Sequence, residues 1–456
     1  MLRKYLFYTM FLFGPISLGA QELTNTQHEV TDTISFKQSL LIGLENSRSL
    51  KKAYLDEESA LHNRHEIRGA GLPQVNASGQ YRNFIDVFPQ AIPGGIFGGD
   101  PGSIEVIAFG VPQSIQAGVQ INQLIYNQSY LIGLKAAKTG EEFYKLLSQQ
   151  TEENVIYEIA ANYFAAIQLE LQKENLLANI EQLEGLEKVL EAQYKNDLAR
   201  KVDFNRVKVN LTTLQSDLEN LEINIIERKG YMKLLMGIPI DAPIELNMDL
   251  GVEDNDLPGF TLSGLNLYDR KDLQVLDVQK QLYNYELKNI KATNRPQLVG
   301  FADFNKNSFS SSFDWFDQSK VWYQGFLIGL KLDIPIFDGF ITRSKAAQSK
   351  VKAKQLQYDI SLAEESANLE YQNSTSKYFN SINTLNSLNS NLDLAKEVME
   401  ETDLLYKEGL SPLTDLLEAE ATLRSAQSSY NNQIIQVRIA QLEILNATGN
   451  IKNLLN

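Results

Sequence analysis

The sequence predicts a mainly α-helical chain with a small β part, built from two copies of one structural unit. Three observations predict this fold: an internal repeat, long proline-free stretches with regularly spaced apolar residues, and four short stretches of alternating polarity. The chain has 456 residues and 43% apolar residues, which is enough for a large folded domain. Its net charge of −15 makes nucleic acid an unfavourable partner.

The internal repeat is clearest where YKNDLARKVD at 194–203 is echoed, 212 residues later, by YKEGLSPLTD at 406–415. Shorter echoes occur elsewhere in the same order, which is typical of a duplicated unit. The sequence therefore predicts a first structural repeat over residues 21–240 and a second over residues 259–456. A connecting segment at 241–258 joins them.

Proline placement predicts very long helices. No proline occurs at 113–238, at 336–411 or after 412, and proline breaks helix interiors. A helix from about 127 to 195 would be about 100 Å long. Spacings of three and four predict coiled-coil packing for Leu176, Ile180, Leu183, Leu186 and Leu190.

Four strands are predicted, at about 73–85, 112–125, 296–305 and 322–336. The second alternates most strictly, with polar or small residues between Ile115, Ala117, Val119 and Ile121. About ten residues suffice for a tilted strand to cross a bilayer, and this alternation suits a water-filled barrel. A soluble sheet with one wet face is the alternative. Four strands cannot close a membrane barrel, so several copies of the chain are expected to contribute strands, and three copies would give twelve.

The N-terminal segment is expected to be a secretory signal peptide covering residues 1–20. Basic Arg3 and Lys4 precede an apolar stretch at 5–13, and small residues precede Gln21. The chain has no cysteine, which excludes disulfides and thiolate metal sites.

The order of these segments resembles the outer-membrane efflux proteins, the family of TolC-like exit ducts. The resemblance rests on the duplicated order and on the motifs LPQVNASGQY, IGLKLDIPIFDG, YKEGLSPLTDLLEAEATLRSAQ and AQLEILNATG. It implies a homotrimer whose twelve-stranded β-barrel lies in the outer-membrane lipid of a Gram-negative bacterium. A helical barrel would extend into the periplasm and meet a periplasmic adaptor protein, which couples it to an inner-membrane transporter.

The two echoed segments, 194–203 and 406–415, are expected to be helix–turn–helix tips at the periplasmic end of this duct. In the second tip, Gly409 would end one helix, and Ser411 would cap the next, with Pro412 at its first position. The resemblance implies that Asp415 and Glu418 face the pore axis as a gate. The alternative is that acids in a first helical turn only complement the helix dipole.

The resemblance also implies a polar latch at the tip that includes Tyr406 and Asp203. The chain departs from the family pattern at Ser411, where the best-studied pattern has an arginine. Three basic residues of the first tip are candidates to replace that arginine: Arg200, Lys201 and Arg206.

Two leucines beside the turns, Leu198 and Leu410, are candidates for adaptor docking, with local packing as the alternative. Glu420 is expected to be solvated or to lie between helices. Both interpretations depend on which helix face each residue occupies.

No enzyme, metal or cofactor site is predicted. His62 and His65 are three residues apart, but a metal site needs further ligands and only His28 remains. The preferred function is the exit duct of a tripartite efflux pump. The alternatives are the outer-membrane component of type I protein secretion and a non-channel periplasmic coiled-coil scaffold.

Overall fold

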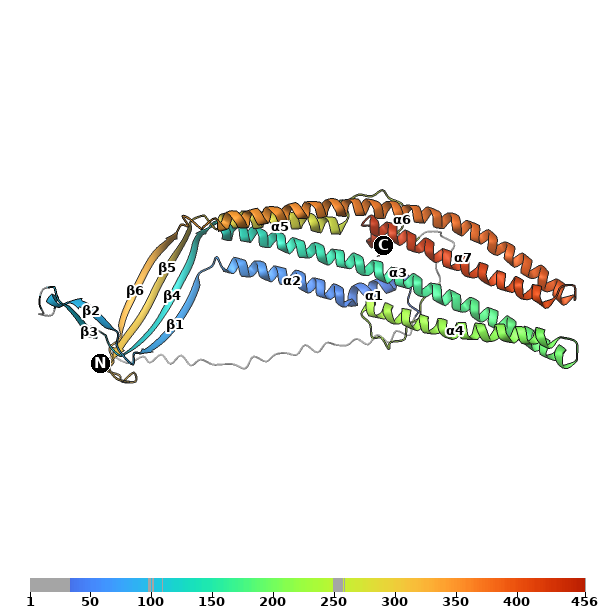
Figure 1. Cartoon of the computed structure of the whole chain (residues 1–456), viewed down its shortest axis with the longest axis horizontal. Coiled ribbons are helices and arrows are strands. Elements are labelled where there is room, and N and C mark those ends of the chain that lie inside the picture. Colours follow the sequence, from blue (N-terminus) through green and yellow to red (C-terminus); the bar gives the residue numbers. More distant parts are fainter. Residues whose placement is uncertain are drawn as a thin grey trace, which may run out of the picture.

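The computed structural model describes most of the chain, and the signal peptide predicted at 1–20 lies outside the described residues. The described residues are 33–96, 100, 102–108, 110–248, 257 and 259–455. They form one elongated molecule with a sheet at one end and long helices running away from it (Figure 1).

Four long helices make up most of the molecule. Helices α3 (Gln128–Lys195) and α6 (Ile341–Lys407) leave the sheet and have 68 and 67 residues. Each then turns back into a shorter helix, α4 (Lys201–Met236) or α7 (Leu413–Ala447). At 1.5 Å per residue, α3 is about 100 Å long, as the proline spacing predicts.

Three shorter helices cover the part of the long helices nearer the sheet. Helix α1 (Phe36–Asn46) precedes α2 (Arg48–Gly69), which packs along α3, while α5 (Lys271–Ala292) packs against α3 and α6. A 3-10 helix, η2 (Ile451–Leu455), ends the described chain. No helix among the described residues is long and apolar enough to cross a membrane.

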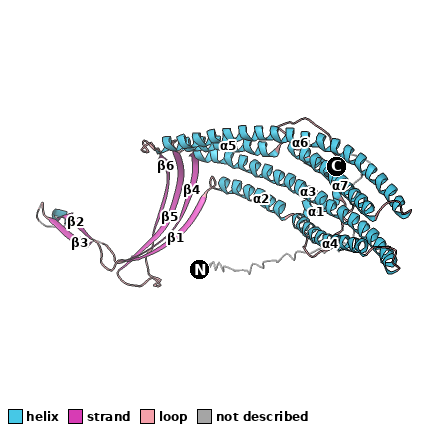
Figure 2. Ribbon diagram, turned by 45° about the vertical axis from the view of Figure 1, so that its right-hand side comes forward, coloured by secondary structure: helices cyan, strands magenta, loops and turns pink. Residues whose placement is uncertain are grey.

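The four predicted strands are present and form one antiparallel sheet in the order β1-β4-β5-β6 (Figure 2). Their bounds are β1 (Gln74–Asn83), β4 (Gln113–Asn127), β5 (Gln297–Ser310) and β6 (Tyr323–Asp333). Strand β5 extends five residues beyond the predicted end at 305 because it pairs with β4 as far as Ser310. Strand β6 ends before the predicted 336, since Pro335 cannot donate a ladder hydrogen bond.

The register places apolar residues of neighbouring strands on one face of the sheet. Val119 pairs with Phe304, which in turn pairs with Phe326. On the opposite face Gln120 pairs with Asp303, but that face also carries Val299, Phe301 and Leu327. The predicted alternation is therefore confirmed for β4 and most of β6 and is weaker in β5. Strands β1 and β6 are the free edges of this sheet.

A second, two-stranded ribbon was not predicted. Residues 86–112 are rich in proline and glycine, yet β2 (Pro89–Pro93) and β3 (Ile104–Ala108) pair there in antiparallel fashion. Between them lies the short 3-10 helix η1 (Gly94–Ile96). Each strand has only five residues, which is too short for alternation to outweigh the proline and glycine signals.

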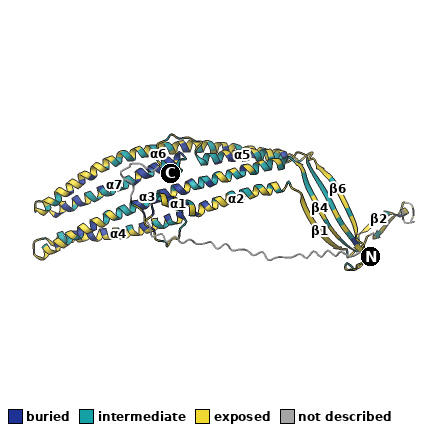
Figure 3. Cartoon of the chain, turned by 180° about the vertical axis from the view of Figure 1, so that it is seen from behind, coloured by how far each residue is buried: buried dark blue, intermediate teal, exposed yellow. Residues whose placement is uncertain are grey.

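The largest apolar core lies midway along the helices, where both repeats meet (Figure 3). It contains fully buried residues from several elements, including Leu40, Ile156, Ile159, Met236 and Leu442. The connecting segment contributes to it: Leu246 is buried and forms a parallel bridge with Ile34. Residues 249–256 and 258 of that segment lie outside the described part of the chain.

Candidate gate at the helical tips

The two helix hairpins end side by side, at the end of the molecule opposite the sheet (Figures 1 and 2). Each turn contains one residue in the left-handed region, Asp197 with φ 61° and Gly409 with φ 73°. In each turn the next residue donates a backbone hydrogen bond of 2.8 Å, from Leu198 N to Gln193 O and from Leu410 N to Leu405 O. The 212-residue repeat is thus a repeat of backbone geometry.

The predicted capping of the second tip is wrong in one respect. Pro412, not Ser411, is the N-cap of α7, with an extended backbone at φ −73° and ψ 158°. Since the N-cap lies one residue later than predicted, the Ser411 hydroxyl is not placed to cap the helix. It donates instead to Oδ2 of Asp415 at 3.0 Å. Gly409, Ser411 and Pro412 all lie between α6 and α7, as expected.

One apolar cluster holds both hairpins together beneath the turns. It joins residues of all four long helices: Ile180, Leu183, Leu190, Val207, Leu211, Leu214, Met399, Leu413, Leu416 and Ala419. Buried aliphatic side chains each contribute about 1.5–3 kcal/mol of transfer free energy. The relative position of the two turns is therefore set by packing within one chain.

The two predicted gate acids lie on the exposed side of α7. Asp415 and Glu418 are exposed, whereas Leu413, Leu416 and Ala419 of the same turns are buried in the cluster. The hydroxyls of Ser411 and Thr414 contact Oδ2 and Oδ1 of Asp415 at 3.0 Å and 3.2 Å. Among the described residues, neither carboxylate has a lysine or arginine partner, so both negative charges are uncompensated within the chain.

The two predicted latch residues lie near each other. Burial raises the pKa of the Tyr406 hydroxyl, and the negative charge of Asp203 raises it further. No hydrogen bond joins them in the described structure. Asp203 pairs instead with Arg200, whose Nε lies 3.0 Å from Oδ2. Since the Arg200 side chain is 83% exposed, this pair contributes at most about 1 kcal/mol.

Glu420 is a buried acid that the sequence analysis did not assign to the site. Only 4% of the residue is exposed, and burial raises the pKa of its carboxyl group, while Arg424 opposes the rise. Within the described structure, Glu420 Oε1 and Arg424 Nη1 are buried without hydrogen-bond partners. The sequence does indicate this burial, because residue 420 follows Leu416 by four positions and therefore shares its buried helix face.

The two leucines proposed for docking are both exposed. Leu198 is 78% exposed and Leu410 is 75% exposed. Neither side chain is buried by its own chain, so adaptor docking stays a prediction for both. They lie at equivalent positions of the two turns, so each chain presents a pair of apolar side chains at its tip.

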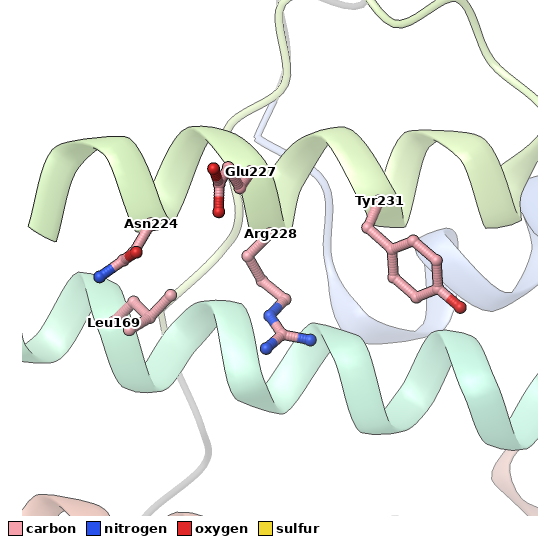
Figure 4. A pocket seen from close by; sticks show the side chains of 5 residues that line it. All are labelled: Leu169, Asn224, Glu227, Arg228 and Tyr231. Atoms are coloured by element: carbon pink, nitrogen blue, oxygen red, sulfur yellow. The ribbon is translucent and has the colours of Figure 1, made fainter.

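A separate groove lies between α3 and α4, near the end of α4 that is farther from the tip (Figure 4). Its volume is about 380 Å³, and it is lined by Leu169, Asn224, Glu227, Arg228 and Tyr231. Arg228 Nη1 donates to Asn162 Oδ1 at 2.9 Å, which ties α4 to α3 beside the groove. None of its lining residues belongs to the tips.

The described residues contain no group of three or more histidine, cysteine or acidic side chains arranged to hold a metal ion. The rings of His62 and His65 lie 6.3 Å apart on α2, and His62 lies 3.7 Å from the carboxylate of Glu58. His28 is outside the described residues.

Comparison with known proteins identifies a family for the second repeat. Residues 262–450 match the model of the family described as Outer membrane efflux protein. The chain is also similar to the outer membrane protein TolC of Salmonella enteritidis, with 20% identity over 441 residues. That alignment covers 92% of this chain and 83% of the relative.

Solved structures share the fold over nearly the whole chain. The outer membrane protein VceC from Vibrio cholerae superposes with a TM-score of 0.70 and 15% identity, covering 91% of this chain and 96% of that one. The CmeC outer membrane channel of Campylobacter jejuni gives a TM-score of 0.72 and 16% identity, covering 91% and 85%. The predicted fold class and the resemblance to TolC-like outer-membrane efflux proteins are therefore confirmed.

Proposed function

Because its second repeat carries an outer membrane efflux protein domain, we propose that this chain is one subunit of a trimeric outer-membrane efflux channel. The observation that carries the proposal is the four-stranded sheet with an exposed apolar face and two free edges.

The exposed apolar face supports a position in lipid. Four alternate residues of β6 point to this face and are largely exposed: Phe326 at 72%, Ile328 at 73%, Leu330 at 68% and Leu332 at 58%. An apolar strand face of this kind would be unfavourable in water but is expected in the hydrocarbon of a bilayer. The named relatives are outer membrane proteins, which supports an outer-membrane location in a Gram-negative bacterium.

The free edges support a trimer. Edge strands β1 and β6 leave backbone N–H and C=O groups unpaired, and such groups cannot remain unpaired in lipid. Pairing β1 of one copy with β6 of the next would close the sheet. Three copies supply the twelve strands expected from the family resemblance and exceed the minimum of about eight.

The gate assignment rests on the charges at the tips. Three copies of Asp415 and Glu418 would place six carboxylates around one axis, where they would attract cations and repel one another. The exposed Leu198 and Leu410 would meet the hairpins of a periplasmic adaptor, which links the duct to an inner-membrane transporter. Substrates would then cross the periplasm and outer membrane in one step, with no chemistry performed by the chain.

Single-channel conductance in planar lipid bilayers tests this proposal. We expect the purified protein to form trimers with a small, cation-preferring conductance. The Asp415→Ala/Glu418→Ala variant should conduct more and lose its cation preference. If each of the two rings contributes about 1 kcal/mol, the permeability ratio should fall roughly 25-fold.

Asp203→Ala is the matched control, because it removes the acid at the equivalent position of the first tip. Because Asp203 is also a predicted latch residue, its loss would raise the conductance, but it should leave the cation preference of the unmodified channel intact. If Asp415→Ala/Glu418→Ala leaves the ion preference unchanged, these two acids do not form the gate. Correctly folded trimers without any conductance would overturn the channel proposal and favour a periplasmic scaffold.

A further inference from the structure

Basic residues are concentrated where the helices meet the sheet, although the net charge of the chain is −15. Four segments adjoin the strand ends there, at 59–73, 128–138, 282–296 and 334–354. Together they contain twelve lysine or arginine residues and only three acidic residues. We call these four segments the basic collar. A chain with excess negative charge thus carries a positive belt at one level.

Most of the collar charge is not neutralised within the chain. Arg64 pairs with Glu141 at 2.7 Å, and Lys352 pairs with Glu286 at 3.3 Å. The other ten bases are exposed and have no ion-pair partner among the described residues. Like charges so close together repel one another, so an external anion would stabilise them.

The charge is densest at the start of α6. Five bases lie within four turns there, with no acid between Asp338 and Asp359: Arg343, Lys345, Lys350, Lys352 and Lys354. All five are exposed. This segment follows directly from β6, whose apolar face we place in the bilayer. It therefore lies at the level where the strand face ends.

The exposed apolar linker between β6 and α6 indicates that the anion is a lipid headgroup. Between β6 and α6, Ile336 is 96% exposed, Phe337 is 74% exposed and Phe340 is 61% exposed. Exposed apolar and aromatic side chains next to lysines are typical of a membrane surface, where the apolar groups enter the acyl region and the bases meet headgroups. A soluble phosphate ion would use the bases but not the linker.

A second copy of the chain adds further positive charge at the collar itself. Its collar has the same sequence, and even the segment at 59–73, which leads into the free edge strand β1, has two bases and one acid. Three acids, Asp56, Glu57 and Glu58, precede that segment on α2, so a neighbouring α2 would offset part of the charge farther along α6. The bases nearest the sheet would be left for anionic lipid headgroups.

We infer that the basic collar binds anionic phospholipid headgroups in the periplasmic leaflet of the membrane, with the linker at 334–340 entering the acyl region. The inference rests on the proposed function, because it requires the sheet to lie in a bilayer. The phosphodiester of the headgroup would accept hydrogen bonds from lysine and arginine at the start of α6. The collar would fix how deeply the channel sits.

Lipid retention on the intact trimer tests the inference. The purified protein is equilibrated with phosphatidylglycerol or with phosphatidylcholine, and the retained lipids are counted by native mass spectrometry. We expect selective retention of phosphatidylglycerol. Lys345→Gln/Lys350→Gln/Lys354→Gln should weaken it by about a hundredfold, since each of the three bases near an anionic surface contributes on the order of 1 kcal/mol.

The matched control removes three positive charges at the opposite end of the molecule, as Lys201→Gln/Arg206→Gln/Lys208→Gln. These side chains are exposed and form no ion pairs within the described structure. This variant should retain phosphatidylglycerol as the unmodified protein does.

Equal retention of both lipids, or equal loss in both variants, would overturn the inference. Displacement by millimolar inorganic phosphate would also overturn it, in favour of a free-anion site. Conducting trimers that show no lipid preference would leave the channel proposal intact, whereas a chain that does not enter bilayers would overturn both.

Discussion

The two helical tips have the same backbone but different chemistry. Asp197 and Gly409 occupy the same left-handed position, and the ion pair Lys195–Glu191 is repeated as Lys407–Asp403. The acids that begin the returning helices differ, since Asp203 pairs with Arg200 while Asp415 contacts only hydroxyls. Arg200 is replaced by Pro412 at the equivalent position.

This difference lies in the side chains of the two tips and not in their backbone. The turn requires only one left-handed residue and an extended residue before the helix, and both halves meet that requirement. Side chains outside the turn were free to diverge. The first tip neutralises its acid, and the second leaves Asp415 and Glu418 uncompensated, which is what an electrostatic gate at the second tip requires.

The largest expected effect tests the packing that the two tips share. Leu416→Ala should destabilise the protein by about 2–5 kcal/mol, because it leaves a cavity among buried side chains of both hairpins. Urea titration of the helical circular dichroism signal would measure it. Leu410→Ala is the control, since that leucine is exposed. Equal stability of the two variants would mean that the cluster does not hold the tips together.

The two tips also differ in whether a charged side chain is buried. Glu420 is buried, whereas the residue at its equivalent position, Lys208, is exposed. Burial raises the pKa of Glu420 above its unfolded value, so the folded state binds its proton more tightly. Stability should therefore fall as the pH rises through the folded pKa and be retained below the ordinary glutamate value.

The Glu420→Gln variant removes this pH dependence of the folding stability. It should stabilise the protein at neutral pH by about 1–3 kcal/mol, because the neutral amide avoids the desolvation of a buried negative charge. The gain should vanish near pH 4, where the unmodified residue is protonated. Unfolding at a series of pH values, with exposed Glu418→Gln as the control, measures the difference. A gain that is independent of pH would indicate a packing effect.

Substitutions at the two left-handed turn residues should change the stability in opposite directions. Gly409→Ala should destabilise the second tip by about 1–2 kcal/mol, because an L-residue is strained in the left-handed region. Asp197→Gly should stabilise the first tip or leave it unchanged, since glycine adopts this conformation without a steric penalty. Denaturation midpoints of the two variants provide the comparison. Two changes of the same sign would contradict the equivalence of the turns.

The smallest expected effect on stability is at the exposed leucines. Leu198→Ala and Leu410→Ala should each change the free energy of unfolding by less than about 0.5 kcal/mol, while weakening capture of the purified protein by its periplasmic adaptor. Surface plasmon resonance with an immobilised adaptor would measure this. Val209→Ala, an exposed position away from the turn, is the control. Unchanged binding in both leucine variants would move adaptor docking away from the turns.

The sequence alone determined the architecture of the chain. Proline-free stretches and regular apolar spacing predict α3, α4, α6 and α7. Alternation predicts β4 and β6 strongly and β1 and β5 more weakly. These signals are local, because a helix or a strand imposes its own period on the residues that it buries. The 212-residue repeat similarly predicts that both tips share a turn, and Leu198 and Leu410 lie where that repeat places them.

Only the tertiary structure decided which side chains are paired and buried. It assigns the N-cap to Pro412, pairs Arg200 with Asp203, buries Glu420 and reveals the ribbon of β2 and β3. It also brings the four segments of the basic collar to one level, although up to about 290 residues separate them. Such features depend on which elements lie side by side, and the burial and electrostatic energies that follow from those contacts have no period along the chain.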